Sequence, residues 1–223
     1  MLELFDAEVG RIITLTLRMT LLSTSISAIL GIPLGLWLDY VNFFGKRLVV
    51  MINRTLMALP PVVIGLVVYL ALMREGPLGF LGLLFSFEAM VIAQVLLITP
   101  IICGMVYTAS QQNAQRIRVF AATMGANKNQ TRLLLIKELG NEIYFSIITG
   151  FGRAMSEVGA IMIVGGNIRH HTRTMTTSIS LLRNRGEIDQ AILLGIALML
   201  IAFGVQLVAS IIRKKERRTD ENF

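Results

Sequence analysis

The sequence predicts an all-α, polytopic membrane protein with about five transmembrane helices. Its 223 residues are 54% hydrophobic and only 16% charged, and the mean hydropathy is +0.69. These values are typical of a chain embedded in a bilayer. No internal repeat, low-complexity tract or Ser/Gly-rich linker divides the sequence. We therefore expect a single transmembrane domain over residues 1–223.

Five segments are long and apolar enough to cross a hydrocarbon core of about 30 Å, which takes about 20 helical residues. The fourth is the least apolar, because it contains Arg153 and Glu157. A further apolar stretch, residues 78–87, is too short to span and is predicted to be interfacial or re-entrant. The predicted spans are 12–38, 55–73, 89–109, 143–164 and 191–212.

The distribution of cations predicts the orientation. If residues 110–142 are cytoplasmic, thirteen Lys and Arg residues fall on the cytoplasmic side and six on the other, with Arg18 and Arg153 inside predicted spans. Cytoplasmic loops carry the excess of Lys and Arg, so the N-terminus is expected outside and the C-terminus inside. Cations beside apolar spans are expected to face the lipid surface, so the formal charge of +7 does not indicate a nucleic-acid partner.

Four prolines inside or beside the spans are candidate helix bends: Pro33, Pro60, Pro61 and Pro100. Membrane helices tolerate proline where neighbouring helices or water satisfy the freed backbone groups. Two interpretations stay open. The glycines and prolines either allow close helix packing through small residues, or mark bent helices that line a path.

The polar stretch 114–139 predicts two short helices that meet at Gly125. Residues with one-face helical spacing precede the glycine, and a broad apolar surface, 133–136, follows it. Gly125 is expected to end the first helix in a left-handed conformation. Such a corner favours a docking surface for a soluble partner. The alternatives are a helix pair lying on the membrane surface and a DNA-reading helix-turn-helix.

The corner resembles the cytoplasmic loop of ABC-importer membrane subunits, which reads Glu-Ala-Ala, three residues, Gly, and later Ile-x-Leu-Pro. In that register Ala121 is the second alanine, Gly125 the glycine and Leu135 the isoleucine, whereas Val119 replaces the glutamate and Glu138 the proline. The resemblance makes 110–142 a cytoplasmic coupling loop. Its predicted docking residues are Ala121, Ala122, Met124, Gly125, Ala126, Leu135 and Ile136.

A second resemblance is stronger. Residues 152–160, GRAMSEVGA, and 165–168, GGNI, are similar to the Arg-Ala-x-x-Glu-x-Gly-Ala and Gly-Asn-Ile run of permeases for molybdate, tungstate and sulfate. Residues 58–65, ALPPVVIG, resemble the same family, and the overall pattern is closest to tungstate permeases.

These resemblances imply a type I ABC-importer permease in a prokaryotic inner membrane. They imply a homodimer, cytoplasmic ATP-binding subunits seated on the coupling loop, and an extracytoplasmic substrate-binding protein that delivers a tetrahedral oxyanion for transport by alternating access. No phosphate-binding loop, nucleophile elbow or zinc helix is present in the sequence, so ATP hydrolysis is expected in the partner subunits and no cofactor is expected. The alternative is a self-contained ion-driven carrier or channel for a small anion.

Charged residues within and near the fourth span have two interpretations each. Arg153 and Glu157 are four residues apart and can pair; they either lie on a transport path or form a neutralised pair that fixes helix register. The segment 169–185 carries four Arg and both His residues. It either concentrates an anion or binds an acidic partner, or is a solvated loop. Adjacent His170 and His171 lack further ligands, so no metal site is expected.

Overall fold

The computed structural model describes the backbone of residues 2–220 and the side chains of 8–127 and 129–211. Within that range every regular element is a helix, which confirms the all-α prediction. The elements are α1 (Leu2–Tyr40), α2 (Lys46–Ala58), α3 (Pro61–Leu72), the 3₁₀ turn η1 (Gly79–Leu81), α4 (Phe87–Thr123), α5 (Lys128–Glu138), α6 (Gly140–Met155), α7 (Gly159–Gly165), α8 (Met175–Asn184) and α9 (Ile188–Asp220).

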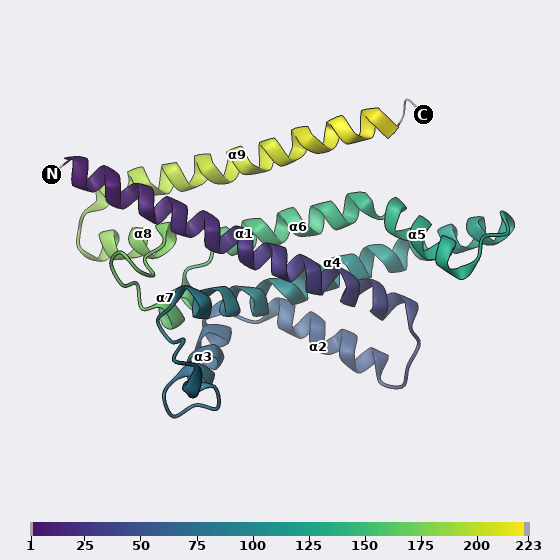
Figure 1. The fold of residues 1–223 in the computed structure, drawn as a ribbon, viewed down its shortest axis with the longest axis horizontal. Helices are drawn as coiled ribbons and strands as arrows, with labels where there is room; N and C mark the ends of the chain where they lie inside the picture. The colour runs from purple at the N-terminus through teal and green to yellow at the C-terminus, as the bar shows by residue number, and fades with distance from the viewer. Residues whose placement is uncertain (1, 221–223) are drawn as a thin grey trace.

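Helix α4 is the centre of the fold, and α1 lies along it (Figure 1). Small residues of α1 recur every four positions on the face that meets α4, among them Ser27, Gly31 and Gly35. A Cβ on Gly35 would lie 2.6 Å from the carbonyl oxygen of Cys103, and one on Gly31 would lie 3.0 Å from that of Thr99. The two backbones are therefore closer than any larger side chain would allow, as is common between membrane helices.

One buried amide connects three helices near the middle of the bundle. Gln94 of α4 accepts a hydrogen bond from the Ser23 hydroxyl of α1 at 2.6 Å and donates one to the carbonyl oxygen of Ala154 in α6 at 2.8 Å. Gln94 and Ser23 are fully buried. Because an unpaired amide in an apolar interior is costly, this arrangement fixes the register of α1 and α6 on α4.

The second predicted span, 55–73, is not one helix. Helices α2 and α3 meet at an angle of 102°, with Leu59 extended and Pro60 and Pro61 at the start of α3. Proline lacks the N–H that would continue the helix and restricts the residue before it. The 12 residues of α3 reach only about 18 Å, which is less than the thickness of a bilayer core.

The fourth predicted span is also broken. Helices α6 and α7 are inclined by 58°, because the chain leaves helical hydrogen bonding between Ser156 and Val158. The shorter halves of both broken pairs then pack together: a Cβ on Gly65 of α3 would lie 2.6 Å from the Cα of Ala160 in α7. The glycine thus permits backbone contact between α3 and α7.

The number of membrane spans depends on these breaks. In the described chain α1, α4 and α9 are long and apolar enough to cross a membrane, and the total becomes five if each bent pair counts as one span. Helix α9 lies at the edge of the fold (Figure 1) and is the least buried of the three. Residues 78–87 contain η1 and a turn, whose Phe85 N–H donates to the carbonyl oxygen of Val164.

Candidate functional site

The segment 110–142 projects from one end of the bundle (Figure 1). The first of its two predicted helices is not separate, because α4 continues without interruption from the apolar core to Thr123. Gly125 follows with φ of 72°, the left-handed conformation expected from the sequence. Asn127 then starts α5 through a capping box, in which its side chain accepts from the Gln130 N–H and the Gln130 side chain accepts from the Asn127 N–H.

The predicted docking residues divide into an inner and an outer set. Ala121 and Leu135 are buried, and Leu135 of α5 belongs to a buried cluster with Ala109 and Ala114 of α4. Ala122, Gly125 and Ile136 are exposed, Ala126 is half-buried, and Met124 is 71% exposed. Three other large apolar side chains are exposed on the same segment, namely Val119, Phe120 and Leu133. An apolar surface at the tip of a polar projection is typical of a site that another protein covers.

A buried carboxylate attaches this projection to α1. Asp39 accepts hydrogen bonds from the Ser110 hydroxyl at 2.8 Å and from the Gln111 amide, and it forms an ion pair with Arg118 at 2.7 Å. Its side chain is only 2% exposed, so its charge depends on these donors. Asp39 therefore fixes the last turns of α4 to the end of α1.

The neighbouring aromatic residue contacts both sides of the Gly125 turn. The Arg132 guanidinium of α5 lies 4.1 Å from the centre of the Tyr40 ring, and that of Arg118 lies 5.9 Å from it. Both distances are within the range of cation–π attraction. Tyr40 thus connects α1 to the helix before the turn and to the helix after it.

Arg153 and Glu157 lie within ion-pair distance, 3.6 Å, but not on one continuous helix. Glu157 is in the break between α6 and α7 and is 3% exposed. Its carboxylate accepts from the Ala160 N–H at 3.1 Å, and its backbone carbonyl accepts from the Thr176 hydroxyl at 2.8 Å. These contacts stabilise the break, so Glu157 holds α6, α7 and α8 in their relative positions.

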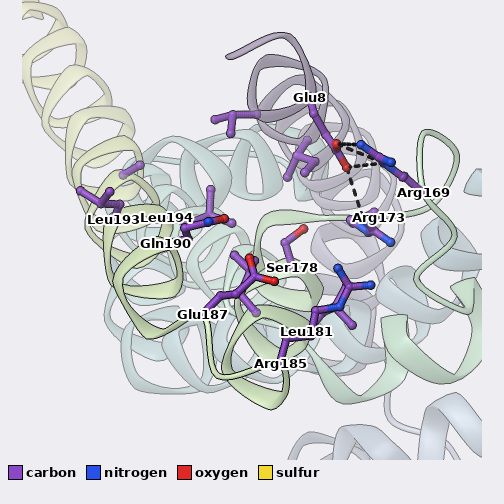
Figure 2. Close-up of a pocket in the computed structure, with 14 residues that line it drawn as sticks. Glu8, Arg169, Arg173, Ser178, Leu181, Arg185, Glu187, Gln190, Leu193 and Leu194 are labelled. Atoms are coloured by element: carbon purple, nitrogen blue, oxygen red, sulfur yellow. Dashed lines mark hydrogen bonds and ion pairs between the residues drawn. The ribbon is translucent and has the colours of Figure 1, made fainter. Parts of the chain in front are cut away.

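The opposite end of α1 carries an ionic cluster beside a cavity of about 340 Å³ between α1, α8 and α9 (Figure 2). Glu8 forms ion pairs with Arg169 at 2.5 Å and with Arg173 at 3.2 Å. Arg169 and Arg173 belong to the segment 169–185, which is rich in cations. The hydrogen bond to the Glu8 carboxylate raises the pKa of Arg169 above its ordinary value.

Comparison with known proteins decides the family. The sequence model of the family described as "Binding-protein-dependent transport system inner membrane component" matches residues 31–218. The chain belongs to this family. It is therefore a multi-pass membrane permease component of a transport system, which favours the importer interpretation over a self-contained carrier.

Three relatives are similar to the permease over most of their length. A tungstate uptake system permease protein of Peptoclostridium acidaminophilum is 44% identical over 92% of this chain and 90% of its own length. A probable anion ABC transporter permease protein of Haloferax volcanii is 35% identical over 96% of each chain. A tungstate uptake system permease protein of Campylobacter jejuni is 34% identical over 92% of this chain and 87% of its own length.

The candidate bends of the permease differ from one another. Pro60 and Pro61 lie at the 102° break, whereas the helices continue through Pro33 in α1 and Pro100 in α4.

Among the described side chains no group of three or more His, Cys, Asp or Glu residues is arranged to hold a metal. The helix-turn-helix alternative has no support from the structure, since the first helix is the end of a membrane-length helix.

Sequence reasoning missed Asp39, Tyr40 and Glu8. The one available signal was position: Asp39 and Tyr40 directly follow the predicted first span, and Glu8 precedes it. Their partners lie 71 to 79 residues away for Asp39 and 161 to 165 residues away for Glu8. A periodicity within one segment carries no information about such contacts.

Proposed function

We propose that this permease is the membrane subunit of an ABC importer that moves a tetrahedral oxyanion, tungstate or molybdate, into a prokaryotic cell. It works as a homodimer in the inner membrane, with the N-terminus outside and the C-terminus inside. ATP-binding subunits bind the segment 110–142 from the cytoplasm, and an extracytoplasmic binding protein delivers the anion. The permease itself catalyses no reaction.

The observation that carries the coupling role is the exposed apolar tip around Gly125. Met124 and Leu133 are 71% and 70% exposed, although a solvated loop gains nothing from presenting apolar side chains. The exposed tip is also attached to the rest of the fold, because Ala121 and Leu135 are buried and Asp39 of α1 binds Arg118 of α4. A surface that is apolar outside and rigidly attached inside is suited to receive a partner and to transmit its movement.

The oxyanion substrate is supported by the similarity to tungstate permeases over nine-tenths of the chain. The sequence also supplies uncharged donors for a dianion. Thr20 and Thr24 of α1 are buried, and their hydroxyls have no hydrogen-bond partner among the described atoms. Uncharged hydroxyls bind an anion weakly enough to let it pass without being trapped.

We place the moving part of the transport path at the two broken helix pairs, α2–α3 and α6–α7. Interrupted membrane helices mark transport sites in many carriers, and here α3 and α7 contact each other next to both breaks. Rocking one pair against the other changes access from one side to the other. Glu157 is engaged within its break and does not serve as an anion ligand.

Co-purification tests the assignment to an importer. Affinity-tagged permease, extracted in mild detergent, should bring down an ABC ATPase in equal amount, and Leu133→Glu should abolish that association by placing a charge on the docking surface. Glu138→Gln is a suitable control, since that exposed side chain lies on α5. Transport by the permease alone, driven by an ion gradient, would refute the assignment.

Uptake measurements test the substrate. Cells lacking the permease should accumulate less tungsten or molybdenum from nanomolar oxyanion, as measured by mass spectrometry, and the wild-type chain should restore accumulation. Selectivity follows from parallel measurements with tungstate, molybdate and sulfate. Restoration of none of the three would contradict the proposed substrate class.

A further inference from the structure

A second cavity, of about 460 Å³, lies beside the Glu8 ion pairs and is rich in basic side chains. It is bounded by the first turns of α1 and by the loop between α7 and α8. Its charged and titratable lining residues are Glu8, Arg11, Arg18, His170, His171 and Arg173. Three guanidinium groups and two imidazoles thus line this cavity. The described lining residues include a single carboxylate, that of Glu8.

The carboxylate is already engaged. Glu8 binds Arg169 at 2.5 Å and Arg173 at 3.2 Å, so little of its charge is left to balance the rest of the cavity. Neither Arg11 nor Arg18 forms an ion pair with any side chain that the structure describes. Arg11, Arg18 and both histidines of the lining are exposed, so the cavity is an open surface with an excess of positive charge, which attracts anions from solution.

Arg11 and Arg18 lie on one face of α1. They are seven residues apart, with Thr14 between them on the same face, and are separated by about 10 Å along the helix axis. Arg18 lies within a helix apolar enough to cross a membrane. A cation at such a position is expensive unless it faces water or an anion, and Arg18 lines the cavity.

Arg173 supplies a donor that no described atom uses. Its side chain is 15% exposed, and its Nε lies buried without a hydrogen-bond acceptor. Buried polar groups are normally paired, so an acceptor entering this region would satisfy a group that is otherwise unpaired. Guanidinium groups match oxyanions especially well, because they offer several N–H donors in one plane.

We propose that this basic cavity is a receiving site for a compact oxyanion. The ligand is a tetrahedral oxyanion with several acceptor oxygens, either the transported dianion or the singly charged phosphodiester of an anionic lipid headgroup. The first source rests on the proposed function, and it places a capture step between the binding protein and the membrane path. Anion binding at Arg11 and Arg18 itself does not depend on transport.

The test compares two double variants with equal changes in charge. Arg11→Gln/Arg18→Gln removes two cations from the cavity, and Arg74→Gln/Arg183→Gln removes two exposed cations that do not line it. The complete permease–ATPase complex is placed in nanodiscs of phosphatidylcholine, without binding protein. Tungstate binding is then measured by equilibrium dialysis with elemental mass spectrometry.

We expect the wild type and the Arg74/Arg183 variant to bind tungstate equally. The Arg11/Arg18 variant should bind about a hundredfold more weakly, about tenfold for each guanidinium that no longer donates to the anion. A parallel sample in phosphatidylglycerol nanodiscs, without tungstate, is examined by native mass spectrometry for retained lipid. Retention of phosphatidylglycerol that depends on Arg11 and Arg18, with no tungstate binding, identifies the lipid headgroup as the ligand.

If the Arg11/Arg18 variant does not assemble, the wild-type complex gives the answer. Phenylglyoxal modifies accessible arginines, and tungstate or phosphatidylglycerol should protect Arg11 and Arg18 but not Arg74. Equal binding by the two double variants, or equal modification with and without both ligands, overturns the proposal. A wild-type complex that imports no oxyanion in cells would instead refute the proposed function, so the two failures are distinguishable.

Discussion

The two ends of α1 are both held by carboxylates, but in different ways. At one end Asp39, whose side chain is 2% exposed, binds three donors on α4. At the other end Glu8, 20% exposed, binds two arginines, one of which is 63% exposed. Removing one partner from a buried charged network leaves an uncompensated charge, whereas exposed ion pairs contribute little. We therefore expect the Asp39 end to be the more firmly held, and the Glu8 end to be the one that a ligand or a partner opens.

Asp39→Ala should have the largest effect of any change in this comparison. It leaves the buried Ser110 hydroxyl without its acceptor and removes the ion pair with Arg118, which is 42% exposed, and an unsatisfied buried donor costs about 1–3 kcal/mol. We expect faster hydrogen exchange in α5 and loss of anion uptake at normal protein levels. Asp189→Ala, at an exposed position of α9, is the control. Equal hydrogen exchange in the two variants would contradict the proposal that Asp39 holds α1 and α4 together.

Gly125→Val is expected to rank second. A β-branched side chain at φ of 72° costs at least about 1–2 kcal/mol, which would displace α5 from α4. ATP hydrolysis by the complex should continue without driving uptake, as measured with both activities in proteoliposomes. Gly204→Val, in the middle of α9, provides the matched control. Normal uptake by the Gly125 variant would exclude a coupling role for this turn.

Arg132→Gln tests the Tyr40 contact and should have a smaller effect. The cation–π attraction that it removes is worth about 0.5–1 kcal/mol at an exposed site, so the rate of uptake per ATP hydrolysed should fall a fewfold. Arg116→Gln removes an exposed cation from the same segment without touching Tyr40. The interpretation requires that Arg132→Gln and Tyr40→Leu have effects that do not add.

Glu8→Gln should change stability least. Of the Glu8 partners, Arg169 is 63% exposed and Arg173 only 15% exposed, and Glu8 itself is 20% exposed, so the thermal unfolding midpoint of the complex should fall only slightly. Anion binding should instead become a fewfold tighter, because Arg173 is released to face the basic cavity. A clear fall in the unfolding midpoint would show that the two ends of α1 are held equally firmly, and would remove the distinction between them.

Local patterns in the sequence predicted part of this structure. Long apolar runs located α1, α4 and α9, and the small-residue corner predicted the positive φ of Gly125. The contact between Arg153 and Glu157 followed from their spacing, but the helix break beside Glu157 did not, since it depends on Ala160 and Thr176. Proline indicated a bend at Pro60 and Pro61, but not its angle of 102° or the contact of α3 with α7.

The contacts that hold the Asp39 end of α1 could not be predicted from the sequence, for the same reason. Asp39 and Tyr40 read as ordinary residues at the end of a span, and only the folded chain brings Arg118 and Arg132 to them. The same holds for the basic cavity, where α1 meets a loop about 160 residues later. Interactions between distant segments, rather than local propensity, decide where α1 is attached to α4 and where the basic cavity lies.

The hydrogen bond between Ser23 and Gln94 attaches α1 to α4 near the middle of α1. Ser23 lies near the midpoint of this 39-residue helix, which is about 58 Å long. A rigid rod supported at its middle swings its ends in opposite directions, and a tilt of about 5° displaces each by about 2.5 Å. That is nearly the length of a hydrogen bond. A tilt of that size about Ser23 would be enough to part Glu8 from Arg169 and Arg173, which lie on the loop between α7 and α8.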